Sequence, residues 1–179
     1  VLGGSSSGGG TRGRFWPQVL QERLGDRATV VSLAWGGATT WHLRRILDRL
    51  DARAEVCVLY GGHNDTTRSV PGRTIAQVEA GAPGGDGLVA AVSLDEARAN
   101  VLAMKERCGR FVVIQERVRG READMAAYAA MLREVPGVDW LDGERLVAPT
   151  DLLDDVHLHP RGHEDFAANV HTSIAGMLP

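Results

Sequence analysis

Residues 55–65 read EVCVLYGGHND, a short apolar, β-branched run that ends in two glycines and three polar residues. A run of this kind, bounded by turn residues, predicts a buried β-strand over Glu55–Tyr60. Helical spacing of apolar residues lies on both sides of it, over Thr40–Leu50 before the strand and Asp95–Arg107 after it. The strand is therefore expected between two helices, which is the building pattern of α/β sheets.

The same alternation of strand and helix runs through the rest of the chain. Further strands are expected at Val1–Gly3, Ala28–Leu33, Arg110–Gln115 and Val138–Leu141. Further helices are expected at Phe15–Leu24, at Glu122–Glu134 and from Pro160 to about Met177. Because consecutive parallel strands need right-handed crossovers, this order predicts a doubly wound α/β fold, a three-layer α/β/α, flavodoxin-like arrangement around a mainly parallel five-stranded sheet.

The length of 179 residues fits a single domain that spans residues 1–179. One stretch, Thr66–Val92, interrupts the alternation, because it is rich in Gly and Pro and longer than a usual connection between a strand and a helix. Two interpretations of it stay open: a lid or specificity insertion, and a solvated insertion with no role.

Composition narrows the function classes. Hydrophobic residues make up 44% and charged residues 24%, as in a globular protein, and a net charge of -3 without basic runs argues against a nucleic-acid partner. The sequence has no apolar run of about 18 residues, so no membrane segment is expected within it.

Cys57 and Cys108 lack metal-ligand spacing and are expected to be two buried or half-buried thiols. The chain opens inside an apolar segment, so a preceding segment is expected, and both localisation (cytoplasmic or secreted) and oligomeric state stay open.

Unusual polar or glycine-rich segments follow several of the expected strands. These segments are Gly3–Gly10, Trp35–Thr39, Gly61–Asp65 and Asp154–His159. In an open parallel sheet, ligands bind beyond the carboxyl ends of the strands, so the four segments are expected to form one site.

Ser5 lies in the first of these segments, GGSSSGGG at residues 3–10. Flanking glycines permit a tight turn with exposed backbone N–H groups, which a nucleophilic serine needs. A flexible linker, a helix N-cap and a phosphate-binding loop are alternatives, although no Gly-Lys-Ser/Thr follows to support the last of them.

The first block resembles that of GDSL-type SGNH hydrolases, which reads Gly-Asp-Ser-x-Thr-x-Gly and then Trp-Pro. Here the corresponding residues are Val1–Gly9 followed by Phe15-Trp16-Pro17 and Leu20. The resemblance places Ser5 at the nucleophile, Ser7 at the Thr and Gly9 at the later Gly. Gly4 stands where the family has Asp, a residue that supports the turn, so the resemblance implies an effect on loop rigidity rather than on the attack itself.

Two further blocks are similar to the family's oxyanion-hole segments. Val30–Thr40 resembles its strand, glycine turn and Thr-Thr helix start, with Gly37 at the oxyanion-hole glycine. Val58–Asp65 resembles its apolar strand followed by Gly-x-Asn-Asp, which makes Asn64 a donor to the oxyanion. An ordinary strand-to-helix turn and an Asx-turn are the respective alternatives.

The last block, Asp154–His163 with Phe166 and Ala167, resembles the family's Asp-x-x-His stretch and the helix after it. Asp154 and His157 take the orienting and base roles. The four blocks follow the family's order from Val1 to Ala167, and together they identify the chain as similar to SGNH hydrolases.

The resemblance implies a serine esterase that works without a metal or cofactor on a small-molecule or carbohydrate ester, with short acyl or acetyl groups favoured. In the implied mechanism His157 activates Ser5, Asp154 orients His157, and the oxyanion is bound by the backbone N–H groups of Ser5 and Gly37 and the amide of Asn64. An acyltransferase that passes the acyl group to a sugar hydroxyl and a non-catalytic SGNH-like binding module are alternatives.

Neighbouring residues compete for the orienting and base roles. His157, His159 and His163 lie close to Asp154 and Asp155, which also permits a metal-dependent phosphoesterase as an alternative. His163 falls on the expected buried stripe of the last helix, where packing is its expected role. His159 precedes Pro160 and is expected to cap that helix. The three-residue spacing favours Asp154 with His157.

Overall fold

The computed structural model describes residues 1–8, 14–50, 53–69 and 89–178. Its main sheet is parallel throughout, with strand order β2-β1-β3-β6-β7. The strands are β1 (Leu2–Gly3), β2 (Leu33–Ala34), β3 (Ala54–Gly61), β6 (Cys108–Gln115) and β7 (Asp139–Leu141). The predicted doubly wound α/β fold with a five-stranded parallel sheet is confirmed.

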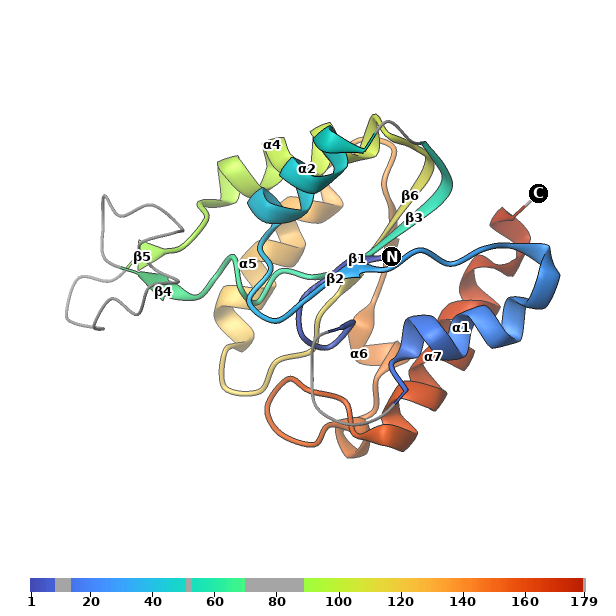
Figure 1. Ribbon diagram of the computed structural model, residues 1–179. Coiled ribbons are helices and arrows are strands. Elements are labelled where there is room, and N and C mark those ends of the chain that lie inside the picture. The colour runs from blue at the N-terminus through green and yellow to red at the C-terminus, as the bar shows by residue number, and fades with distance from the viewer. Residues whose placement is uncertain (9–13, 51–52, 70–88, 179) are drawn as a thin grey trace.

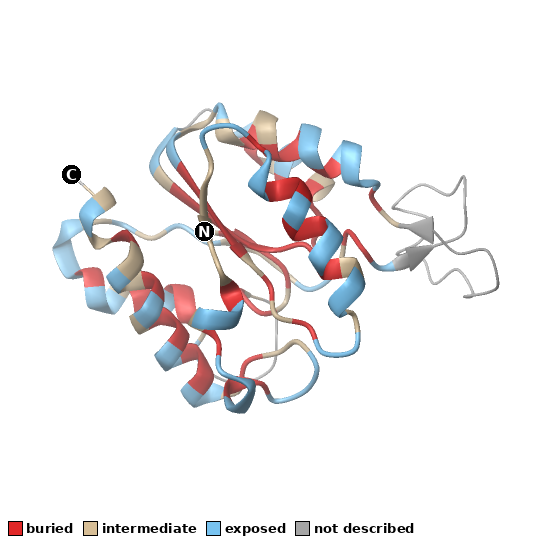
Figure 2. Cartoon of the chain, turned by 180° about the vertical axis from the view of Figure 1, so that it is seen from behind, coloured by how far each residue is buried: buried red, intermediate tan, exposed pale blue. Residues whose placement is uncertain are grey.

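Helices cover both faces of the sheet (Figure 1). One face carries α1 (Trp16–Leu24) and α7 (Pro160–Ile174), and the other carries α2 (Thr40–Arg49), α4 (Leu94–Lys105) and α5 (Glu122–Arg133). The long central strand β3 serves both layers, because successive side chains point to opposite faces. Val58 and Tyr60 pack under α1 and α7, whereas Leu59 packs on the other side. Figure 2 shows the resulting buried residues concentrated between the sheet and the inner faces of the helices.

Short elements complete the described chain. They are α6 (Gly143–Leu146), the 3-10 turns Gly25–Arg27, Pro149–Asp151 and Ala175–Met177, and an antiparallel pair formed by β4 (Arg68–Ser69) and β5 (Val89–Ala90). The predicted insertion Thr66–Val92 lies mostly outside the described residues, since 70–88 are not described. No helix in the described ranges is both long and apolar enough to cross a membrane.

The predicted strand at Ala28–Leu33 is wrong in its bounds, because only Leu33 and Ala34 join the sheet. Next to them, the Val1 amino group donates to the Val31 carbonyl at 2.6 Å, and the Leu33 N–H donates to the Val1 carbonyl at 2.7 Å. The side chain of Gln21, in α1, holds the residues before Val31. Its amide N–H donates to the Ala28 carbonyl, and its oxygen accepts from the Val30 N–H. The apolar, β-branched pattern there reflects contact with α1 rather than strand pairing.

The prediction of two thiols is also wrong, because Cys57 and Cys108 form a disulfide. Cys57 lies in β3 and Cys108 begins the neighbouring strand β6, and their Cα atoms are 5.8 Å apart, within the normal disulfide range. The bond joins residues 51 positions apart, a separation that resembles no motif. The disulfide joins two neighbouring strands of the sheet.

Candidate active site

Ser5 lies in a tight turn directly after β1, at the carboxyl end of the sheet (Figure 1). The turn is closed by the Ser7 N–H, which donates to the Gly4 carbonyl at 3.0 Å. Gly3 allows the turn to approach the centre of the sheet, because a Cβ there would lie 2.6 Å from the Tyr60 carbonyl oxygen. Ser5 is half-buried and is the most accessible of the three serines.

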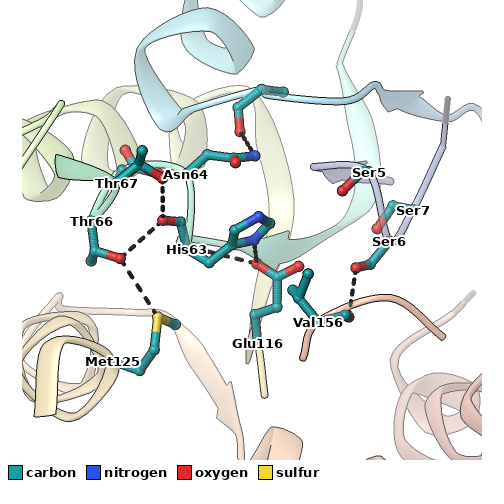
Figure 3. Close-up of polar contacts among 12 residues, drawn as sticks. Ser5, Ser6, Ser7, His63, Asn64, Thr66, Thr67, Glu116, Met125 and Val156 are labelled. Carbon is teal, nitrogen blue, oxygen red and sulfur yellow. Dashed lines mark hydrogen bonds and ion pairs between the residues drawn. The ribbon is translucent and has the colours of Figure 1, made fainter. Parts of the chain in front are cut away.

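The two neighbouring serines are buried and engaged in other bonds. Ser6 Oγ donates to the Val156 carbonyl at 3.0 Å, which ties the turn to the loop before α7 (Figure 3). Ser7 Oγ accepts a hydrogen bond from Trp16 Nε1 at 3.0 Å. The Trp-Pro pair at the start of α1 therefore anchors the turn, and Ser5 is left facing the site.

Ser5, His157 and Asp154 form a continuous chain of polar contacts. Ser5 Oγ lies 2.7 Å from His157 Nε2, and His157 Nδ1 lies 2.7 Å from Asp154 Oδ2. Although the two outer residues are 149 positions apart in sequence, this is the geometry of a nucleophile, a base and an orienting carboxylate.

Asp154 is fixed by the backbone of its own loop. Its Oδ1 accepts from the backbone N–H groups of Val156 at 2.9 Å and His157 at 2.7 Å. Partial burial alone would raise the pKa of Asp154, but these two bonds and the His157 ring lower it to about 2. Asp154 therefore remains a carboxylate at any pH near neutral.

Two further segments lie beside the nucleophile turn. Gly36 lies beside the nucleophile, since a Cβ there would be 4.0 Å from Ser5 Cβ, and Gly37 follows with φ 78°, a conformation that favours glycine. Asn64 follows β3, and its Nδ2 donates to the Ala38 carbonyl at 3.0 Å. A primary amide carries two N–H groups, and this contact, which orients Asn64, is the one bond of its Nδ2 among the described residues.

Gly4 lies against the same amide. A Cβ at Gly4 would be 2.9 Å from Asn64 Nδ2, closer than normal packing permits. The glycine found here in place of the family's Asp is therefore matched to the position of Asn64, a relationship that the sequence did not reveal.

The remaining members of the predicted His and Asp cluster have separate partners. His159 caps α7 as expected, with Nδ1 accepting from the Gly162 N–H and Nε2 lying 2.6 Å from the Thr150 carbonyl. His163 is buried against Phe15, and burial followed by the charges of neighbouring histidines lowers the pKa of His163 to about 4. Asp155 is exposed. In the described part of the chain, no three His, Cys, Asp or Glu side chains are grouped as a metal site.

Two buried carboxylates beside the site were not singled out from the sequence. Asp65 accepts from the N–H of Thr40 at 3.1 Å and from its hydroxyl, which joins the end of β3 to the start of α2. Burial raises the pKa of Asp65 to about 7, against the opposing effect of the Thr40 bonds. Glu116, the residue after β6, contacts His63. Its position at a strand end is the signal that could have identified it.

Comparison with known proteins agrees with this geometry. Residues 1–164 match the sequence model of the GDSL-like Lipase/Acylhydrolase family. The fold resembles Axe2, an acetylxylan esterase from Geobacillus stearothermophilus, with 15% identity, a TM-score of 0.64 and coverage of 97% of this chain and 91% of Axe2. It also resembles LAE5, an alpha/beta hydrolase from the metagenome of Lake Arreo, Spain, with 16% identity, a TM-score of 0.68 and coverage of 99% and 94%. No curated protein sequence matches the chain.

Proposed function

Because the chain belongs to the GDSL-like lipase/acylhydrolase family and is an esterase of the SGNH type, we propose that it hydrolyses short acyl esters, including acetyl esters of carbohydrates, with Ser5 as nucleophile. The observation that carries this proposal is the Ser5–His157–Asp154 chain, with both links at 2.7 Å. Hydrolysis of an ester bond follows from the family. The proposal concerns which residues are catalytic and which esters are the substrates.

In the proposed mechanism, Asp154 accepts a hydrogen bond from the Nδ1–H of His157, which leaves Nε2 unprotonated and able to take the hydroxyl proton of Ser5. Ser5 Oγ attacks the ester carbonyl, and the developing oxyanion receives hydrogen bonds from the N–H groups of Ser5 and Gly37 and from Asn64 Nδ2. Collapse of this intermediate expels the alcohol, which takes the proton from His157, and leaves Ser5 acylated.

Deacylation repeats the same steps with a new acceptor. The side chains of His157 and Asp154 are 41% and 50% exposed, so water has direct access to the base. We propose water as this acceptor; a sugar hydroxyl in its place would make the protein an acyltransferase. A carbohydrate ester as substrate is supported by the shared fold with Axe2, which is described as an acetylxylan esterase.

The first experiment is labelling with a fluorophosphonate, followed by peptide mapping. We expect the label on Ser5, and we expect Ser5→Ala to lose turnover of 4-nitrophenyl acetate while Ser32→Ala, at an exposed position before β2, retains it. A label on Ser6 or Ser7, or full activity in Ser5→Ala, would contradict the assignment.

The substrate is tested with 4-nitrophenyl esters of increasing chain length and with acetylated sugars. We expect kcat/KM to be highest for acetate and to fall as the acyl chain grows. Added sugar alcohols should not divert acetyl groups from water, and acetylated sugar as the main product would identify a transferase. Activity that disappears on dialysis against a chelator and returns with zinc or manganese would favour the metal-dependent alternative.

A further inference from the structure

A second imidazole–carboxylate pair lies beside the nucleophile turn, formed by His63 and Glu116 (Figure 3). His63 Nδ1 is 2.6 Å from Glu116 Oε2, and the backbone N–H of His63 donates to the same oxygen at 3.3 Å. The two residues come from adjacent strand ends, His63 after β3 and Glu116 after β6. The mechanism above uses neither of them.

Glu116 is fully buried, with a side-chain exposure of 0%, and its Oε1 has no hydrogen-bond partner among the described residues. An isolated buried carboxylate is strongly unfavourable, so a proton or positive charge on His63 stabilises it. Burial by itself lowers the pKa of His63, but the charge of Glu116 and its hydrogen bond outweigh burial and raise it, with Arg121 opposing and Asp65 assisting. Glu116 thus favours protonation of the ring, and in the protonated ring both nitrogens are donors.

The ring of His63 faces the nucleophile turn. A Cβ at Gly4 would lie 3.7 Å from His63 Cε1, so the imidazole edge packs next to the residue that precedes Ser5. Nδ1 is engaged with Glu116, and Nε2 is directed away from Glu116 toward the side on which Ser5 and Asn64 lie (Figure 3). Nε2 has no hydrogen-bond partner in the described part of the chain, and 13% of the side chain is exposed.

The chemistry of the substrate limits what Nε2 can bind. This step rests on the proposed function: a short acyl group has no polar atom besides its carbonyl oxygen, and Ser5, Gly37 and Asn64 already provide donors for that oxygen. An additional donor is therefore useful only toward an oxygen of the alcohol part of the ester. Since Glu116 balances the charge of His63, the pair is neutral overall and suits a neutral hydroxyl rather than an anionic group.

We propose that His63, oriented by Glu116, is a substrate-binding residue that donates a hydrogen bond from Nε2 to a hydroxyl group of the alcohol, so that the enzyme selects esters of polyhydroxylated alcohols. If this donor is lost, the enzyme favours esters that carry the hydroxyl less strongly. The hydroxyl then loses a hydrogen bond to water on binding and gains none from the protein.

The test compares two acetate esters, an acetylated methyl xyloside and 4-nitrophenyl acetate, which lacks hydroxyl groups on its alcohol. The readout is the ratio of their kcat/KM values. In His63→Gln we expect this ratio to fall about ten- to hundredfold, the effect of removing one hydrogen bond from a charged donor. His171→Gln, near the end of α7, is the matched control and should keep the wild-type ratio.

Glu116→Gln should lower the same ratio, and combining it with His63→Gln should add little, because the two residues act as one unit. If Glu116→Gln does not fold, His63→Gln decides the question, with thermal unfolding used to show that it is native. Binding of the acetylated xyloside to Ser5→Ala should weaken about tenfold or more when His63→Gln is added.

Failure of the inference is distinguishable from failure of the proposed function. An active wild type whose ratio is unchanged in His63→Gln overturns the role of His63 alone. One that hydrolyses 4-nitrophenyl acetate but not the xyloside ester overturns the role of His63 and the carbohydrate part of the proposed substrate, while ester hydrolysis by Ser5 stands. A wild type that hydrolyses neither ester and takes no fluorophosphonate label overturns the proposed function as well.

Discussion

Reduction of the Cys57–Cys108 disulfide should destabilise the protein substantially while leaving its chemistry intact. With the two cysteines 51 positions apart, the chain-entropy description gives a loss of about 14 cal/mol/K in the unfolded chain, or about 4 kcal/mol at 25 °C. For a chain of 179 residues this corresponds to a fall in Tm of about 10 °C. Cys57 is four residues before the end of β3, so the bond lies about 13 Å along the strand from the site.

The assay is thermal unfolding followed by circular dichroism, with and without reductant, on the wild type and on Cys57→Ala/Cys108→Ala. We expect the wild type in reductant to unfold about 10 °C lower than without it. The double variant should unfold at a low temperature in both conditions, since it has no bond to reduce. At 25 °C, kcat on 4-nitrophenyl acetate should be similar in all folded samples. A Tm that reductant leaves unchanged would refute the reasoning.

Four further outcomes follow from the site. Asn64→Ala should lower kcat about two to three orders of magnitude while Tm stays near that of the wild type, and unchanged kinetics would make Asn64 a turn residue. Gly4→Ala should also lower kcat, because its Cβ would lie 2.9 Å from Asn64 Nδ2. Gly176→Ala is the control and should leave kcat unchanged, because a Cβ there has nothing within 4 Å. Equal kcat values for the two variants would contradict this. Asp154→Asn should reduce kcat roughly 10⁴-fold and Asp155→Asn should retain most activity, with steady-state kinetics deciding between the two carboxylates. The pKa of Asp154 is about 2 in the folded protein and 3.8 ordinarily, so its ionisation stabilises the fold above about pH 4. The Tm difference between wild type and Asp154→Asn should therefore shrink as pH falls toward 2. A difference that stays constant would argue against the lowered pKa.

The central strand illustrates what is predictable from local pattern. Glu55–Tyr60 was expected as a strand and forms most of β3, because an apolar, β-branched run of that length is buried on both faces of a parallel sheet. Ala28–Leu33 has a similar pattern, but only its last residue joins the sheet, and the backbone of Ala28 and Val30 bonds to Gln21 of α1, which belongs to another part of the chain.

The histidines illustrate the same contrast within the site. The capping position of His159 and the burial of His163 follow from their offsets to Pro160 and Phe166, which are local relationships. The contact of His63 with Glu116 joins residues 53 positions apart and depends on the register between β3 and β6. No local pattern carries that information.

The sequence alone thus determined the strand and helix order, the parallel α/β class, and the segments gathered at one edge of the sheet, because each depends on periodicity and on the rule that parallel strand ends meet at one edge. Only the tertiary structure decided the disulfide, the use of Ser6 and Ser7 as structural contacts, the fit of Gly4 against Asn64, and the pairing of His63 with Glu116. Each of these is a contact of a few ångströms between residues on different elements. Such distances are set by strand register and by helix packing, which act on the whole chain at once and leave no mark in the spacing of neighbouring residues.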